Sequence, residues 1–154
     1  MKTQNLRINQ LSPKTYHFYL DYLASLDNKD LEQYSTYLSS DVVLQINNQP
    51  MISGRMGVVK YLEQYWRTFE SVEHELLNIY GNDEAFVLEA MNDYKRNDGK
   101  MVQVRAVAFT DLDERGKVRS VRLYSDVSPV FEKGEQWVEE ESSMDGEMIV
   151  DLAL

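Results

Sequence analysis

The sequence predicts a single α+β domain in which helices from the first half of the chain cover a strongly curved antiparallel sheet. Apolar residues recur at helical spacing up to residue 69, and after residue 70 they alternate with a period of two. The four strands expected after that change are nine to twelve residues long, and strands of such length twist and curl. A chain of 154 residues can also bury a core of its own.

Three helices are expected first. Ser12 is predicted to cap a helix that starts at Pro13 and runs to residue 26. Asn28 is expected to cap a short second helix, and Ser53 a third. The apolar residues on the buried sides of these helices are Tyr19, Tyr22, Leu23 and Leu26 in the first, Leu31, Tyr34 and Leu38 in the second, and Val58, Leu62, Tyr65, Trp66 and Phe69 in the third.

The strands come next. A short strand is expected over 42–46, with a brief partner strand at Met51 and Ile52. Four long strands joined by hairpin turns are then expected over 72–80, 85–95, 101–112 and 118–126. One face of the third long strand carries only small apolar residues. We assign that face to the concave side of the sheet, where small side chains leave room for a cavity: Val102, Val104, Ala106 and Ala108.

The composition limits the chemistry and the compartment. The chain has no cysteine, which excludes disulfides, thiolate nucleophiles and cysteine-bound metals. Its first residues contain no apolar run typical of a secretory signal. No stretch approaches the roughly eighteen apolar residues that a membrane-crossing helix needs. We therefore expect a cytoplasmic protein that makes no contact with a membrane.

The negative charge is concentrated at the C-terminal end. The formal net charge is −10, and residues 132–154 hold eight acidic residues against one lysine, which leaves −3 for residues 1–131. Such a balance argues against nucleic acid as a partner, because binding to phosphates needs clustered lysine and arginine. We expect a domain over 1–131 and an acidic extension over 132–154 that packs on the domain or on a partner chain.

Four segments match a known family in their order and spacing. They are 22–31, 41–44, 53–62 and 113–126, and the last contains Gly116-Lys117-Val118 and closes on Tyr124-Ser125-Asp126. This pattern resembles the NTF2-like superfamily, in particular its SnoaL-like and ketosteroid-isomerase-like branches, over residues 14–131. The resemblance implies a cone-shaped, cystatin-like α+β fold around a hydrophobic pocket. It also implies a small hydrophobic molecule as ligand, no cofactor, and a homodimer formed through the sheet.

The catalytic residues of the steroid isomerases carry over only in part. The resemblance places their tyrosine at Tyr22. Their catalytic aspartate base and their second, protonated aspartic acid fall at Ile46 and Ala108, which have no carboxyl group. We therefore do not expect steroid isomerase activity.

Three residues are the catalytic candidates. Asp126 stands where many members of the family end on Tyr-x-Asp, so it is a candidate general base, and the alternative is a strand-end carboxylate in solvent. His74 is a candidate acid or base because of its residue type, and it faces the cavity if it shares a register with Val72 and Leu76. Tyr22 either donates a hydrogen bond to a ligand or belongs to the core.

The predicted pocket lining consists of Tyr19, Trp66, Phe69, Met91, Val104, Ala106 and Ala108. Glu89 and Asp93 lie on the same strand as Met91 and form either an inward carboxylate pair or, as we expect, an exposed charged face. His17 is expected in solvent. Two isolated histidines without a carboxylate at ligand spacing do not predict a metal site.

Two classes of function remain open. The first is a SnoaL-like enzyme without a cofactor, an acid–base cyclase, isomerase or hydratase acting on a hydrophobic substrate. The second is a non-catalytic module that binds a ligand or assembles as a dimer, which the missing isomerase carboxyl groups favour. A transport adaptor is a third interpretation. A homodimer is expected in every case, because Val107 and Phe109 would otherwise leave apolar area of the outer sheet face in water.

Overall fold

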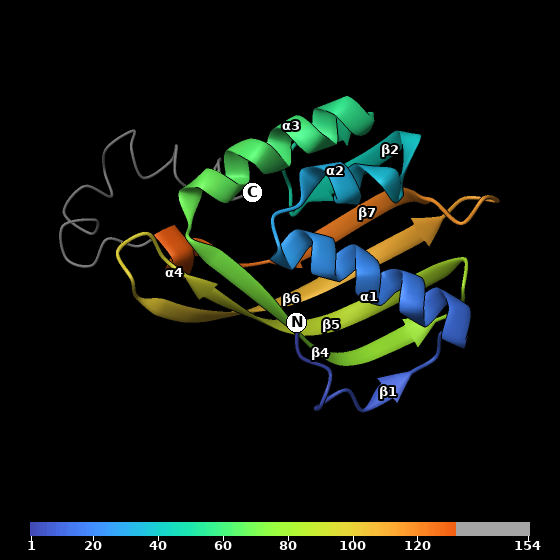
Figure 1. Ribbon diagram of the computed structural model, residues 1–154, viewed down its shortest axis with the longest axis horizontal. Helices are drawn as coiled ribbons and strands as arrows, with labels where there is room; N and C mark the ends of the chain where they lie inside the picture. Colours follow the sequence, from blue (N-terminus) through green and yellow to red (C-terminus); the bar gives the residue numbers. More distant parts are fainter. Residues whose placement is uncertain (132–154) are drawn as a thin grey trace.

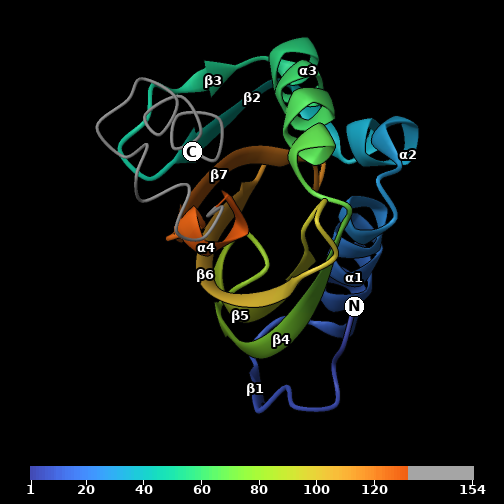
Figure 2. The same cartoon turned by 90° about the vertical axis from the view of Figure 1, so that its left-hand side faces the viewer.

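The computed structural model describes residues 1–131, so the extension expected over 132–154 lies outside the described residues. It confirms the α+β fold class. Within these residues one seven-stranded sheet curls into an open cone, and helices α1, α2 and α3 lie over its concave side (Figures 1 and 2). The long strands expected after residue 70 form most of the wall.

The first helix, α1 (Pro13–Asp27), begins where the sequence predicts. The Ser12 side chain accepts a hydrogen bond from the backbone N–H of Thr15, and Pro13 occupies the first helical position, where its missing N–H costs nothing. Asn28 ends the helix as its C-cap.

The caps predicted for the other two helices are wrong. Asp30, and not Asn28, caps α2 (Leu31–Thr36), because Asn28 already closes α1 and Lys29, with a φ of 53°, turns the chain between them. Leu38 lies beyond α2, at the start of the strand that follows it.

The third helix, α3 (Arg55–Tyr65), begins after Gly54, which has a φ of 85° and no side chain to form a cap. Ser53 cannot cap it because it belongs to a short strand. A 3-10 turn, η1 (Trp66–Thr68), follows α3, and Phe69 is extended.

The strand order across the sheet is β1-β4-β5-β6-β7-β2-β3. Neighbours from β4 to β7 are antiparallel, as are β2 and the expected brief partner β3. The pairs β1–β4 and β2–β7 are parallel, and the sequence predicted neither pairing. The strands are β1 (Ile8–Asn9), β2 (Leu38–Ile46), β3 (Ile52–Ser53), β4 (Ser71–Gly81), β5 (Ala85–Lys95), β6 (Met101–Leu112) and β7 (Val118–Ser125), and a short helix, α4 (Ser128–Phe131), follows them.

Strict alternation along the long strands decides which side chains face the hollow. On β5 every second residue is buried, namely Phe86, Leu88, Ala90, Asn92 and Tyr94. On β6 the small residues Val104 and Ala106 are buried on the same face. The register shifts between β4 and β5 and between β6 and β7, and such irregularities bend strands and increase their twist.

Lys29 fixes one wall of the cone. Its Nζ donates hydrogen bonds to the backbone oxygens of Trp66 at 2.9 Å and Phe69 at 3.0 Å, and it lies 4.9 Å from the centre of the Phe69 ring. These carbonyls belong to the 3-10 turn that follows α3 and to the extended residue after it, where backbone oxygens lack partners within a helix. The link between α1 and α2 is therefore tied to the turn that presents Trp66 and Phe69.

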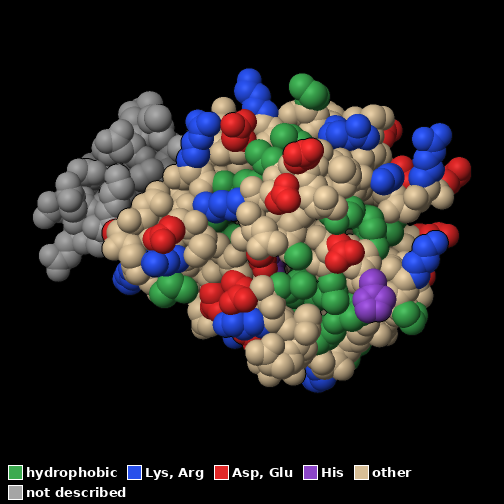
Figure 3. All heavy atoms as spheres, viewed as in Figure 1, with side chains coloured by type: hydrophobic (Ala, Val, Ile, Leu, Met, Phe, Trp, Pro, Cys, Tyr) green, Lys and Arg blue, Asp and Glu red, His purple; other side chains and the backbone are tan. Residues whose placement is uncertain are grey.

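The helical face carries mixed charges. Acidic and basic side chains are interspersed over the helices on the face shown in Figure 3, without the continuous positive patch that binds a nucleic-acid backbone. Among residues 1–131, no helix is long and apolar enough to cross a membrane.

We predict that Gly81→Ala destabilises the fold more than Gly99→Ala does. Both glycines have positive φ, 125° and 87°, which costs an alanine about 1 kcal/mol. At Gly81 a Cβ would also lie 2.3 Å from the Ala85 backbone oxygen, whereas at Gly99 no atom lies within 4 Å. The clash should add about 1–3 kcal/mol to the loss at Gly81. Urea unfolding measures both variants, and equal losses would contradict this account of the hairpin.

Candidate functional site

A cavity of about 120 Å³ lies between the concave face of the sheet and the helices. Apolar and aromatic side chains line most of it, and none of the described lining residues is a lysine, arginine, aspartate or glutamate. Of the residues that the sequence singles out, Tyr19, Tyr22, Trp66, Phe69, His74, Ala106 and Ala108 line this cavity. An uncharged wall of this kind favours a neutral apolar guest.

Three other predicted site residues do not line the cavity. Met91 alternates with the buried Ala90 and Asn92, so it faces the outside of the sheet and its placement in the pocket is wrong. Val104 is buried in the core but does not border the cavity. Asp126 is exposed, and its carboxylate accepts a hydrogen bond from the backbone N–H of Ser128 at 3.1 Å, as a strand-end capping group does.

Glu89 and Asp93 share the outward register of Met91. Asp93 accepts hydrogen bonds from Lys2 at 3.1 Å and from Gln103 at 2.8 Å. Glu89 accepts one from Asn78 at 2.7 Å. The two carboxylates therefore have partners outside the cavity and form no inward pair.

The histidine that borders the cavity is hydrogen bonded to a carboxylate. His74 lies on β4 between the buried Val72 and Leu76 in register, and its ring borders the cavity. The ring Nδ1 is hydrogen bonded to the Asp27 carboxylate, whose second oxygen accepts from the His74 backbone N–H at 3.3 Å. Asp27 is the last residue of α1 and is not among the cavity-lining residues.

This contact determines how the imidazole can act. A carboxylate only accepts hydrogen bonds, so Nδ1 carries the proton and Nε2 is the nitrogen that can take up another. The bond at Nδ1 orients the ring, and the bond from the His74 backbone N–H holds the carboxylate in place. Among the described residues Nε2 has no hydrogen-bond partner, which leaves it available to a guest in the cavity.

The Asp27 carboxyl stays ionised at neutral pH. Burial alone would raise its pKa, but the hydrogen bonds from the ring and backbone of His74, together with the Met1 amino group 3.0 Å away, lower the pKa below its usual value of 3.8. The ionised carboxylate accepts the hydrogen bond from Nδ1 and so keeps the proton on that ring nitrogen.

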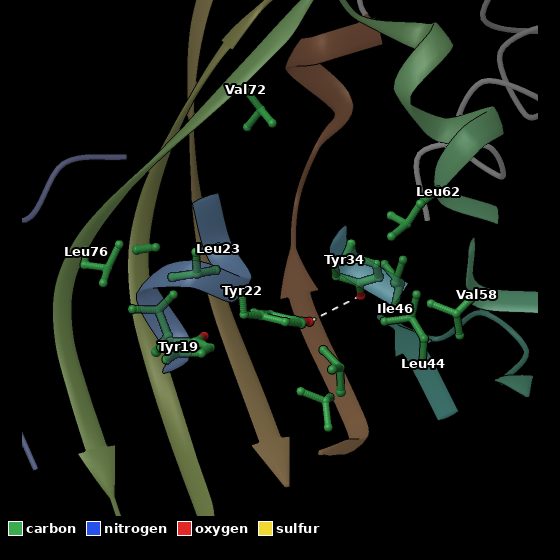
Figure 4. Close-up of a cluster of buried hydrophobic side chains, with 14 of the residues drawn as sticks. Tyr19, Tyr22, Leu23, Tyr34, Leu44, Ile46, Val58, Leu62, Val72 and Leu76 are labelled. Carbon is green, nitrogen blue, oxygen red and sulfur yellow. Dashed lines mark hydrogen bonds between the residues drawn. The ribbon is translucent and has the colours of Figure 1, made fainter. Parts of the chain in front are cut away.

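Tyrosine hydroxyls provide most of the remaining polarity. The hydroxyls of Tyr22 and Tyr34 lie 3.3 Å apart, as the dashed line in Figure 4 shows, and those of Tyr65 and Tyr94 lie 3.1 Å apart. Burial raises the pKa of Tyr22 to about 12 and also raises that of Tyr94, on which the charge of Asp27 acts in the same direction. These phenols are therefore neutral hydrogen-bond donors near pH 7.

Sequence reasoning missed two residues of this site. Asp27 looked like a residue that ends a helix, and nothing in its neighbourhood points to a histidine 47 positions away. Asn92 did leave a signal, because it is a polar residue in the buried register of β5 between Ala90 and Tyr94. Asn92 is 5% exposed, borders the cavity and pairs across the sheet with His74.

Comparison with known proteins identifies the family of the fold. The SnoaL-like domain matches residues 19–121, and no curated protein matches the sequence. A protein from Shewanella denitrificans OS-217, described as a SnoaL-like polyketide cyclase, superposes with a TM-score of 0.66 at 13% identity, covering 76% of this chain and 93% of its own.

Two similar solved structures are described as enzymes of epoxide chemistry. A LEH-like epoxide hydrolase from M. tuberculosis has a TM-score of 0.64 at 18% identity, over 84% of this chain and 95% of its own. SalBIII, described as an epoxide hydrolase/cyclase-like enzyme in pyran ring formation in the polyether salinomycin, has a TM-score of 0.65 at 15% identity, over 75% and 92%. Identities this low show a shared fold.

We predict that Asp27→Asn removes an acid-sensitive part of the stability. The folded-state pKa of Asp27 lies below its unfolded value of 3.8, so the ionised carboxylate stabilises the fold above about pH 4 and loses this effect as the pH falls through the folded-state pKa. The variant should be less stable at pH 7 by about 1–3 kcal/mol and should lose less stability than wild type on acidification. Urea unfolding over a pH series measures both effects.

The matched control is Asp21→Asn, which removes an exposed carboxylate from the same helix. It should stay near wild-type stability at pH 7. A wild-type and an Asp27→Asn protein with parallel pH profiles would show that the contact with His74 contributes nothing to folding.

Proposed function

Because this chain belongs to the SnoaL-like domain family, we propose that it is an acid–base enzyme that needs no cofactor and acts on a small, neutral, hydrophobic molecule. The observation that carries the proposal is the Asp27–His74 pair at the wall of an apolar cavity. A histidine ring oriented by a buried carboxylate is a common arrangement for a general base.

In the proposed reaction His74 moves the proton. Its Nε2 takes a proton from the substrate or from a water molecule, while Nδ1 stays bonded to Asp27 and the carboxylate stabilises the imidazolium. The imidazolium then returns the proton to the product and His74 becomes neutral again. General acid–base catalysis of this kind contributes about 10²–10⁴ in rate. Tyr22 and Tyr94 line the same cavity as neutral hydrogen-bond donors and serve to bind the guest.

The cavity limits the size of the substrate. Its volume of about 120 Å³ is below that of typical drug-sized pockets. An engineered apolar cavity of about 150 Å³ holds benzene, so a guest the size of one ring fits the scale of this cavity. The absence of charged groups among the described lining residues favours a neutral substrate over an ion.

Two reactions are consistent with the Asp27–His74 pair and with the activities described for solved structures that share the fold. In water addition to an epoxide, His74 takes a proton from water as the water oxygen bonds to a ring carbon. The carbon–oxygen bond of the epoxide at that carbon breaks in the same step, and the freed oxygen receives the proton from the imidazolium to give a diol. In cyclase- or isomerase-type chemistry, His74 removes a proton next to a carbonyl and returns it elsewhere. Both need one base and an apolar site.

We also propose that a second copy of the chain covers the outer face of β6 and β7. Tyr124 is 49% exposed there and packs edge-on against Phe109 at 5.9 Å, and Arg122 lies over the same ring at 5.4 Å. Tyrosine, phenylalanine and arginine are the residue types enriched in protein interfaces. The open face of a curved sheet would thus be shared between two protomers.

His74→Gln tests the catalytic proposal, because glutamine keeps polarity but cannot exchange a proton near pH 7. Small epoxides, followed by diol formation, and cyclic ketones, followed by deuterium uptake from D2O, are the probes. We expect wild type to convert one of the two classes and His74→Gln to lose about 10²–10⁴ in kcat. His17→Gln, at the exposed histidine of α1, should keep wild-type activity.

Two results would contradict the catalytic proposal. Full activity of His74→Gln would remove the histidine from the chemistry. Binding of a ring compound by wild type, without conversion of either probe class, would favour the non-catalytic ligand-binding module instead.

Tyr124→Glu tests the proposed dimer. A charge at an exposed aromatic residue in the centre of the interface should give a monomer in light scattering after gel filtration, whereas wild type gives a dimer. Tyr80→Glu, at a comparably exposed tyrosine on β4, is the control and should leave the dimer intact. A monomeric wild type over the micromolar range would refute this interface.

A further inference from the structure

The cavity contains one carboxamide, at a position that faces the proposed base. Asn92 on β5 is the direct cross-strand partner of His74 on β4, and both side chains border the cavity. Cross-strand partners on one face have their Cβ atoms about 4.5–5.5 Å apart, so one small molecule can reach both. No other asparagine and no glutamine is among the described lining residues.

The carboxamide oxygen of Asn92 is not satisfied by the protein. It is buried and has no hydrogen-bond partner among the residues that the structure describes, although the residue is only 5% exposed. A buried acceptor without a donor is unfavourable, and nearly all buried polar groups in folded proteins have a partner. The remaining side chains in this register of β5 are apolar or aromatic, so a leucine in place of Asn92 would fit the pattern.

We infer that Asn92 binds a hydroxyl group of the ligand next to His74, so that the ligand class is a neutral, ring-sized molecule that carries a hydroxyl. This inference rests on the proposed function for the role of His74, and it adds the substrate class. A hydroxyl is the smallest neutral group that supplies a donor to the asparagine oxygen. A site built to bond a hydroxyl discriminates strongly against an analogue that lacks it.

Phenol and toluene form a matched pair of probes, because they differ only by a hydroxyl in place of a methyl group. Calorimetric titration gives the ratio of their dissociation constants for wild type and for Asn92→Leu. We expect the leucine variant to shift this ratio about tenfold toward toluene, the effect of one hydrogen bond. Ser125→Ala is the control. It removes a cavity-lining hydroxyl that already donates to the Arg105 backbone oxygen at 2.8 Å, and it should leave the ratio unchanged.

The stability of the empty protein provides a second measurement. Because the leucine replaces an unpaired polar group, Asn92→Leu should raise the urea midpoint in the absence of ligand. A lower midpoint would show that the carboxamide has its partner within the fold, and an unchanged phenol-to-toluene ratio would show that it holds no ligand hydroxyl. Either result overturns the inference.

These measurements do not depend on turnover. His74→Gln should abolish conversion of the probes and keep the preference for phenol, whereas Asn92→Leu should lose the preference. An unchanged turnover in His74→Gln would therefore count against the proposed catalytic role alone. An unchanged phenol-to-toluene ratio in Asn92→Leu would count against the hydroxyl subsite alone.

Discussion

Strands β4 to β7 are eight to twelve residues long, and antiparallel strands of that length twist and coil instead of staying flat. Their curl gives the sheet a concave side, and alternation sends every second side chain into it. Small residues on β6 and the overlying helix α1 leave part of this space unfilled. Figure 2 shows the curled sheet, and the cavity, the contact between α1 and β4 and the exposure of the outer face all depend on that curvature.

The electrostatics of the cavity depend on the same geometry. Burial raises the pKa of the hydroxyls of Tyr22 and Tyr94, so both keep their protons, and none of the described lining residues is a lysine, arginine, aspartate or glutamate. Asp27 reaches the imidazole of His74 from the helix layer. The charged carboxylate of Asp27 therefore lies outside the apolar cavity, and it acts on the cavity through its hydrogen bond to the ring of His74.

The fold and one side of the site were predictable from the sequence, because both depend on local periodicity. Alternation placed His74 beside Val72 and Leu76, and the small residues of β6 indicated the concave face. The parallel pairing of β2 with β7 was not predictable, since it joins segments about 75 residues apart. The contact between Asp27 and His74 was not predictable for the same reason, because it depends on how α1 lies across the sheet. Met91 was assigned to the cavity because it is hydrophobic. The register of β5 places Asn92 on the concave face and Met91 on the outer face.

Lys29 gives the cavity wall a mechanical link to the proposed base. It holds the carbonyls of Trp66 and Phe69, and it lies two residues after Asp27 in the same tight turn. A guest too bulky for the hollow would have to push that aromatic wall outward. That wall is held by the same turn that carries Asp27, so the shape of the hollow and the position of the carboxylate beside the imidazole depend on one short segment of the chain.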